Sequence, residues 1–159
     1  MNRLLVTEVG LNKLKTELIN LRDTERPAVI KAIAEAAKHG DLSENAEYHA
    51  AREKQSFIEG RIAQLEESLQ NAEVVDVKKF TGVQDVRFGA KVTLLDEETE
   101  NQVVYKIVSP IEADPEDRLI SQESPLARAI LGRKKGDSVE VALPSEGVRY
   151  YCIESIEYK

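Results

Sequence analysis

Two stretches of regularly spaced apolar residues in the first half of this 159-residue chain constrain its fold more than any other feature. The first proceeds in steps of three and four residues through Leu11, Leu14, Leu18 and Leu21. The second is formed by Ala51, Ile58, Ile62, Leu65, Leu69 and Ala72, with Gln55 as its one polar step. This spacing is typical of the seam of a coiled coil. Two seams of similar length, joined by a short turn around Gly40, predict an antiparallel helical hairpin.

The first seam is interrupted close to Pro27. Glu25 occupies the position where the next apolar residue is due, and a proline inside a helix removes a backbone hydrogen bond. The spacing then resumes on a shifted phase at Ile30, Ile33 and Ala37. We therefore predict a kink or phase break near Pro27. The returning helix is expected to cover residues 44–73, which would reach about 45 Å at roughly 1.5 Å per residue.

The apolar pattern changes near residue 76, which predicts two domains, residues 1–75 and residues 76–159. Short β-branched runs between turn residues predict strands at residues 86–95, 102–108, 138–143 and 148–156, with 74–77 as a further candidate. Ser124 and Pro125 predict the start of a short helix, and Gly132 its end. The expected fold class is α+β: an N-terminal coiled-coil hairpin followed by a small antiparallel sheet domain with one short helix.

Charge argues against direct binding to a nucleic-acid duplex. The chain has 22 basic and 29 acidic residues, a net charge of −7 at pH 7. Residues 1–79 hold 12 basic and 14 acidic residues, and residues 80–159 hold 10 and 15. Neither half has the basic excess that phosphate neutralisation needs. Lys38 and Arg52 flank the turn as local basic positions, whereas the basic run at residues 133–135 is interpreted as a solvated surface.

Cysteine usage and hydropathy predict a cytoplasmic protein. The single Cys152 lies in a predicted strand and has no partner for an internal disulfide, which fits a reducing compartment. The apolar run within residues 1–6 is too short for a signal peptide, and no segment has the length and hydrophobicity to span a bilayer.

Most enzyme chemistries find no support in the residues. His39 and His49 have neither cysteine partners nor a metal-binding spacing, and no phosphate-binding glycine loop or nucleophile elbow is present. The remaining candidates are Asp41 and Glu44, in the turn of the hairpin. A turn lacks the walls that exclude water and orient a substrate. The pair is therefore better placed to complete a site in another molecule than to form one alone.

Two interpretations of Asp41 and Glu44 stay open from their spacing. Asp-x-x-Glu before a helix is a capping box, in which each side chain accepts a hydrogen bond from the backbone amide of the other residue. The same carboxylates are also suitable ligands for Mg²⁺, which is often held by one or two protein carboxylates completed by water and substrate phosphates.

The sequence around the turn, HGDLSENAEYHAARE at residues 39–53, resembles that of the bacterial transcript cleavage factors of the GreA/GreB family. Further matching segments follow in order over nearly the whole chain, at residues 59–62, 88–92, 124–132, 136–137 and 150–158. The hairpin lacks the larger basic patch associated with the GreB branch. The resemblance favours the ligand interpretation of Asp41 and Glu44 over simple capping.

The resemblance implies a function in transcription elongation. The hairpin would enter the secondary channel of bacterial RNA polymerase, where the polymerase itself cleaves backtracked nascent RNA near its 3′ end. Asp41 and Glu44 would act there in trans as ligands of a second, weakly held Mg²⁺ and its attacking water. Lys38 and Arg52 would offset phosphate repulsion near the RNA. The protein is not expected to be an enzyme by itself.

The resemblance also implies that the second domain has an FKBP-like fold and docks on the polymerase at the rim of the channel. Glu123, Ser124 and Pro125 would form this contact, and the factor is expected to be monomeric. Two alternatives remain: a non-cleaving inhibitor of the same channel and an FKBP-like prolyl isomerase. The intact carboxylate pair argues against a simple plug, and the absence of Trp argues against a deep aromatic proline pocket.

Overall fold

The computed structural model describes residues 4–40 and 42–159, which form two compact units. The helical unit comprises Leu11–Ala72, and the sheet unit comprises residues 4–10 together with Glu73–Lys159. Residues 4–10 belong to the sheet unit because β1 (Leu4–Thr7) pairs with β2 (Ala72–Val75), the strand that follows the hairpin. Strand β2 overlaps the candidate strand at residues 74–77, whereas the sequence pattern did not predict β1.

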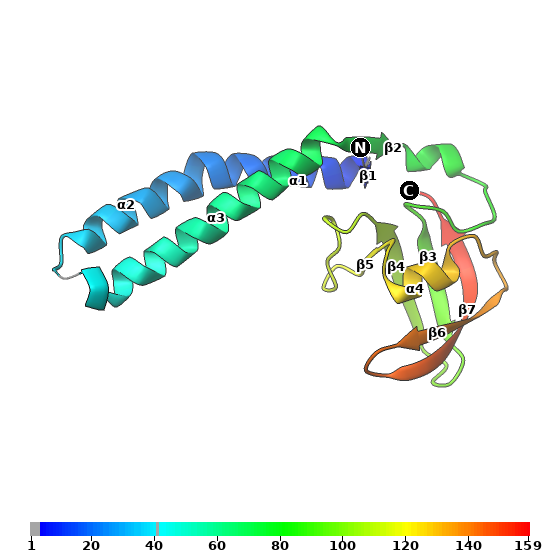
Figure 1. Ribbon diagram of the computed structural model, residues 1–159. Helices are drawn as coiled ribbons and strands as arrows, with labels where there is room; N and C mark the ends of the chain where they lie inside the picture. The colour runs from blue at the N-terminus through cyan, green and yellow to red at the C-terminus, as the bar shows by residue number, and fades with distance from the viewer. Residues whose placement is uncertain (1–3, 41) are drawn as a thin grey trace. The chain divides into compact units, whose positions relative to one another are not determined.

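The helical unit is a hairpin of long helices. Its first arm contains α1 (Glu8–Asn20), a π-helical turn (Leu21–Glu25) and α2 (Arg26–Ala37), and its second arm is α3 (Ala46–Gln70). Helices α2 and α3 lie side by side and run in opposite directions (Figure 1). The buried seam joins the two arms through Val29, Ile58 and Ile62, with Leu18 and Leu21 packed against them. The predicted hairpin is therefore confirmed.

The predicted phase break is a π-helical turn that ends two residues before Pro27. The amide of Arg26 donates to the carbonyl of Leu21, five residues earlier, in place of the usual four. A proline ring clashes with the carbonyl four residues before it in a regular helix, so a wider turn here relieves Pro27. The expected inward positions after the break were wrong by one residue in two cases. Val29 and Ala36 are buried, whereas Ile30 is 52% exposed and Ala37 is also exposed.

The sheet unit contains a five-stranded sheet in the order β5-β4-β3-β7-β6. Its strands are β3 (Lys91–Asp96), β4 (Gln102–Val108), β5 (Leu119–Ser121), β6 (Ser138–Leu143) and β7 (Gly147–Glu157). Strand β5 was not predicted and pairs in parallel with β4, so the sheet is mixed rather than wholly antiparallel. Helix α4 (Pro125–Ile130) contributes Ala127 and Ile130 to the core that the strands bury. The fold class α+β is confirmed.

The predicted strand at residues 86–95 begins only at Lys91, because a turn occupies its first half. Gly89 in this turn has φ +87°, a conformation that side chains disfavour. A Cβ atom at Gly89 would also lie 2.2 Å from Cγ1 of Val77. Backbone conformation and close packing together therefore require glycine at this position.

A buried carboxylate joins β1 to the loop after β4 within the sheet unit. The side chain of Glu112 is 8% exposed and accepts hydrogen bonds from the hydroxyl of Thr7 at 2.6 Å and from the hydroxyl of Ser109 at 2.7 Å. The amide of Ser109 also donates to it, at 3.1 Å. The hydroxyl of Thr7 in turn accepts from the amide of Gly10 at 3.0 Å, which satisfies a free donor in the first turn of α1. Neutral donors thus replace the water that this carboxylate loses on burial.

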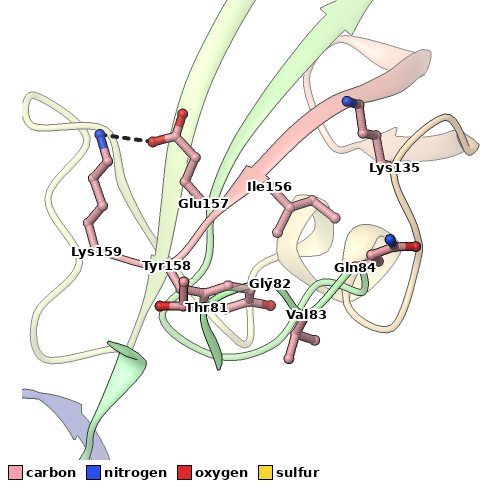
Figure 2. A pocket seen from close by; sticks show the side chains of 9 residues that line it. All are labelled: Thr81, Gly82, Val83, Gln84, Lys135, Ile156, Glu157, Tyr158 and Lys159. Atoms are coloured by element: carbon pink, nitrogen blue, oxygen red, sulfur yellow. Dashed lines mark ion pairs between the residues drawn. The ribbon is translucent and has the colours of Figure 1, made fainter. Parts of the chain in front are cut away.

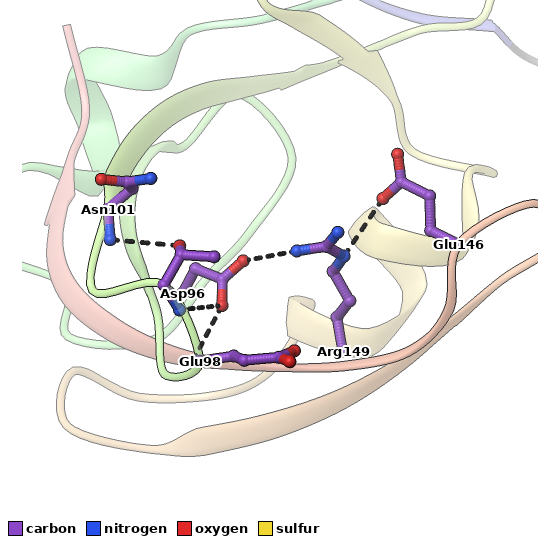
Figure 3. Close-up of polar contacts among 6 residues, drawn as sticks. Asp96, Glu98, Asn101, Glu146 and Arg149 are labelled. Carbon is purple, nitrogen blue, oxygen red and sulfur yellow. Dashed lines mark hydrogen bonds and ion pairs between the residues drawn. The ribbon is translucent and has the colours of Figure 1, made fainter.

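Asp96 stabilises the turn between β3 and β4 (Figure 3). Its carboxylate accepts from the amides of Glu98 and Thr99 at 2.9 and 3.2 Å, and from Nη1 of Arg149 on β7 at 2.9 Å. Nε of Arg149 lies 3.2 Å from the carboxylate of Glu146. Burial acts to raise the pKa of Asp96, but these donors hold it below its ordinary value of 3.8.

Replacing Asp96 by Asn is expected to lower the melting temperature of the protein by several degrees at neutral pH, because the ionised form of Asp96 accepts all three bonds. When the pKa of a carboxyl group is lower in the folded state than in the unfolded state, its ionisation stabilises the fold at pH values above the unfolded-state pKa. This stabilisation is lost as the pH falls through the folded-state pKa. The difference in melting temperature between wild type and Asp96→Asn should therefore shrink below about pH 4. Melting curves followed by circular dichroism at several pH values test this. Asp85→Asn, which removes a surface carboxylate 3.3 Å from Arg87, is the control. A difference that does not change with pH would contradict the assignment.

Candidate functional site at the hairpin tip

The tip of the hairpin, residues 38–49, begins where α2 ends. The amide of His39 donates to the carbonyl of Ala36 at 3.1 Å, and Gly40 has φ +115°. A residue with a positive φ just after a helix is usually glycine, because a side chain there is strained. The short turn predicted around Gly40 is therefore confirmed.

Asn45 closes the tip by bonding to both arms. Its side-chain oxygen accepts from the amide of Tyr48 at 3.0 Å, which caps α3. Its side-chain nitrogen donates to the carbonyl of Ala36, at the end of α2, at 2.7 Å. Helix α3 therefore begins at Ala46, not at residue 44 as expected. The sequence analysis missed Asn45, although an Asn before an acidic first turn is a known N-cap signal.

Replacing Asn45 by Ala is expected to destabilise the helical unit by about 2 kcal/mol, since it removes the N-cap and the bond to α2 together. Asn45→Asp retains the acceptor for the amide of Tyr48 but loses the donor to Ala36, so it should cost less. Urea denaturation followed by far-ultraviolet circular dichroism measures both changes. Equal stability of the alanine variant and the wild type would rule out this role.

Glu44 ends a short 3₁₀ helix (Leu42–Glu44) and precedes the N-cap of α3. Its side chain is exposed, and none of the described residues donates a hydrogen bond to its carboxylate or forms an ion pair with it. Asp41, the other predicted site residue, lies outside the described residues. The N-cap of the long helix α3 is Asn45, so the capping interpretation of Asp41 and Glu44 finds no support at the start of this helix. The carboxylate of Glu44 remains available for another role.

The two basic residues predicted to act near the tip already have partners within the hairpin. Nζ of Lys38 lies 3.6 Å from the carboxylate of Glu35, and both side chains are well exposed. Nη1 of Arg52 donates to the hydroxyl of Tyr48 at 3.0 Å, and its guanidinium lies 5.8 Å from the centre of the same ring. Such exposed contacts are weak and leave both cations accessible to an anion.

The carboxylates of the tip can supply only some of the ligands that a metal ion needs. Within residues 4–40 and 42–159, no group of three or more His, Cys, Asp or Glu side chains is arranged to hold a metal ion. Glu44 offers exposed carboxylate oxygens, the donor type that Mg²⁺ prefers, and Asp41 is a residue of the same type. One or two carboxylates suit a Mg²⁺ ion whose other ligands come from water, phosphate or a second protein.

The predicted docking residues lie at the start of α4. The hydroxyl of Ser124 accepts from the amide of Ala127 at 3.2 Å, so the predicted N-cap is confirmed. Pro125 occupies the first turn of α4, and the amide of Glu123 donates to the hydroxyl of Ser121 at 3.0 Å. Glu123 and Pro125 are exposed, and Ser124 is half-buried. The two residues on either side of the N-cap therefore have side chains that a partner could contact.

A groove of about 690 Å³ in the sheet unit bears on the prolyl isomerase alternative. It lies between the loop at residues 81–84 and the end of β7 (Figure 2). Among the residues that line it, Tyr158 is the one aromatic side chain. The hydroxyl of Tyr158 donates to the carbonyl of Asp85 at 2.5 Å and accepts from the amide of Arg87 at 2.9 Å. The groove therefore does not have the aromatic walls expected of a proline pocket.

Across the described residues, no helix has the length and apolar character needed to cross a membrane.

Comparison with solved structures finds neighbours that span nearly the whole chain. GreA factor homolog 1 (Gfh1) of Thermus thermophilus is 26% identical, with a TM-score of 0.44, over 98% of this chain and 99% of that one. The prokaryotic elongation factor GreA/GreB from Nitrosomonas europaea is 22% identical, with a TM-score of 0.43, over 98% and 100% of the two chains.

Sequence comparison is more decisive. Residues 4–74 match the family model of the N-terminal domain of transcription elongation factors, and residues 81–158 match the GreA/GreB C-terminal domain. Transcription elongation factor GreA of Cereibacter sphaeroides is 54% identical over 99% of both chains, and that of Rhodospirillum rubrum is 51% identical over the same share. Both halves and nearly the full length are thus covered. The chain belongs to the GreA/GreB family of transcription elongation factors.

Proposed function

We propose that this elongation factor stimulates RNA cleavage by bacterial RNA polymerase. The hairpin enters the secondary channel of the polymerase as a monomer and brings its tip to the catalytic centre. The polymerase then cleaves backtracked nascent RNA and regains a usable 3′ end. This proposal is finer than family membership and concerns the tip residues in particular.

The exposed carboxylate of Glu44 carries the proposal. Glu44 precedes the N-cap of α3 and has no partner among the described residues. The turn in which it lies is closed by Asn45, whose side chain bonds to the end of α2. A helix end that is already closed holds a ligand in place before it meets an ion, which lowers the entropic cost of binding. A carboxylate with no structural role at such a position is suited to a ligand in trans.

Asp41 and Glu44 would hold a second Mg²⁺ ion, with the remaining ligands coming from the polymerase, the RNA and water. When bound, such an ion activates an attacking water and stabilises the leaving oxygen. The carboxylates also need the ion in order to approach the RNA, because without it the RNA phosphates would repel their two negative charges. Lys38 and Arg52 reduce the remaining repulsion from the flanks of the tip.

A stalled bacterial elongation complex with RNA labelled at its 5′ end tests the function. Added protein should shorten the RNA from its 3′ end and restore elongation, whereas the protein alone in excess Mg²⁺ should leave naked RNA intact. Inhibited elongation without shortening would favour the channel inhibitor instead. Turnover by the full chain in a protease-coupled proline isomerisation assay would favour the prolyl isomerase.

The sheet unit is proposed to anchor the factor on the polymerase through Glu123, Ser124 and Pro125. Reversing the charge at Glu123 and replacing Pro125 by Ala should weaken polymerase binding by roughly tenfold, because both exposed contacts change. Ser124 is retained, so the cap of α4 and the melting temperature should be unaffected. Glu116→Lys reverses another exposed charge of the same unit and serves as the control. Unchanged affinity of the double variant, measured by fluorescence anisotropy, would place the anchor elsewhere.

A further inference from the structure

A second, smaller groove in the sheet unit collects basic side chains. Its volume is about 270 Å³, and it lies where the first residue of β3 meets the middle of β4 and the start of β5. The residues that line it are Lys91, Val104, Lys106, Asp117, Arg118, Leu119 and Lys159. Four of the ten basic residues between positions 80 and 159 thus lie at one groove of a segment that carries 15 acidic residues.

Three of these cations have no ionic partner within residues 4–40 and 42–159. Lys159 is 3.1 Å from the carboxylate of Glu157, which balances its charge (Figure 2). No described residue forms an ion pair with Lys91, Lys106 or Arg118, although Arg118 lies 5.9 Å from the centre of the Tyr105 ring. Asp117 is the one acidic residue lining the groove, so three unpaired cations face a single carboxylate.

The cations are held together by the sheet. Lys91 and Lys106 are directly opposite each other in the antiparallel pair of β3 and β4, and Lys106 is opposite Leu119 on β5. Like charges directly opposite on neighbouring strands destabilise a sheet. In a chain with an acidic excess, an unpaired cluster of this kind is better explained by an anionic partner than by stability.

We propose that this basic groove, defined by Lys91, Lys106 and Arg118, binds a short acidic segment of a partner protein that also carries aliphatic side chains. The acidic side chains would pair with the three cations. Val104, which is 36% exposed, and half-buried Leu119 supply the apolar floor. The groove is separate from the start of α4, and its occupation does not depend on how the tip acts.

A nucleic acid fits the groove less well. Residues 80–159 have five more acidic than basic residues, which opposes the approach of a long polyanion. No aromatic side chain is among the residues that line the groove, so it lacks the aromatic platforms on which successive bases stack. A short acidic peptide can contact the basic groove and is repelled less than a long polyanion by the surrounding acidic residues.

Fluorescence anisotropy with the full protein tests the proposal. The probe is a fluorescein-labelled peptide of alternating Glu and Val, compared with a labelled single-stranded RNA of equal charge. We expect saturable peptide binding that K91Q/K106Q/R118Q weakens by roughly tenfold or more. R133Q/K134Q/K135Q removes the same charge elsewhere in the unit and should change the affinity less than about twofold. Replacing the valines of the peptide by serine should also weaken binding.

Amide chemical shifts of the wild-type protein, recorded during peptide titration, give a readout that does not depend on how the variants fold. The largest changes should fall at Lys91, Val104, Lys106 and Arg118. Three results would overturn the proposal: no saturable binding of the peptide, equal loss in the two triple variants, or shift changes located elsewhere. Tighter binding of the RNA that the groove variant abolishes would also overturn it, in favour of a nucleic-acid site.

Discussion

Replacing Asp41 and Glu44 together by Asn and Gln is expected to reduce stimulated RNA cleavage by orders of magnitude while polymerase binding stays nearly unchanged. The amides keep the size of the side chains but lose the negative charge that holds a divalent ion. Without a placed second Mg²⁺, the attacking water is not activated. The rate of RNA shortening in a stalled elongation complex, measured at saturating factor, gives this effect directly.

Glu47→Gln is the matched control, because Glu47 is an exposed carboxylate in the first turn of α3. It should leave the cleavage rate close to that of the wild type. If Asp41 and Glu44 only stabilised the turn, the double variant would lose about 1 kcal/mol of hairpin stability and retain its activity. Full activity of the double variant would therefore refute the ligand role.

Gly10→Ala is expected to destabilise the sheet unit by about 3 kcal/mol. A Cβ atom at Gly10 would lie 1.4 Å from Oε1 of Glu112, so the carboxylate has to move. Glu112 is buried and bonded to Thr7 and Ser109, and any displacement breaks these bonds without giving access to water. Chemical denaturation followed by the near-ultraviolet circular dichroism of the tyrosines measures this, because four of the five tyrosines belong to the sheet unit.

Gly60→Ala makes the same substitution in α3, where a Cβ atom would meet nothing within 4 Å. Alanine is the better helix former, so this variant should be more stable than the wild type by roughly 0.5–1 kcal/mol. The opposite signs of the two substitutions distinguish the clash at Gly10 from the general effect of glycine in a helix. A stabilising Gly10→Ala would show that Glu112 relaxes freely.

The elements predicted correctly from the sequence are those whose signals are local. The seam of α3 and the cap of α4 at Ser124 follow from spacing and cap chemistry within a few residues. Strands β1 and β5 are four and three residues long, and each forms only because a distant strand pairs with it. Such short segments carry too little alternation to be recognised without that partner.

The candidate site was predictable only in part. Spacing alone identified Asp41 and Glu44 but could not separate capping from metal binding, and the resemblance to the GreA/GreB family favoured the second. Asn45 was missed although its cap role follows a known local signal, but its second bond, to the carbonyl of Ala36 nine residues earlier and on the other arm, could not be predicted from that signal. A rule that considers only the helix following a cap does not include such a contact.

The π-helical turn at Leu21–Glu25 also affects how the length of the first arm can vary. A π-helical turn is equivalent to one residue inserted into an α-helix. The arm thus contains a surplus residue that is absorbed between α1 and α2, and the seam continues beyond it at Val29. Removing one residue within this turn would keep Val29 in the seam, and hence the register of the tip against α3, but it would return the clash between the ring of Pro27 and the carbonyl four residues before it.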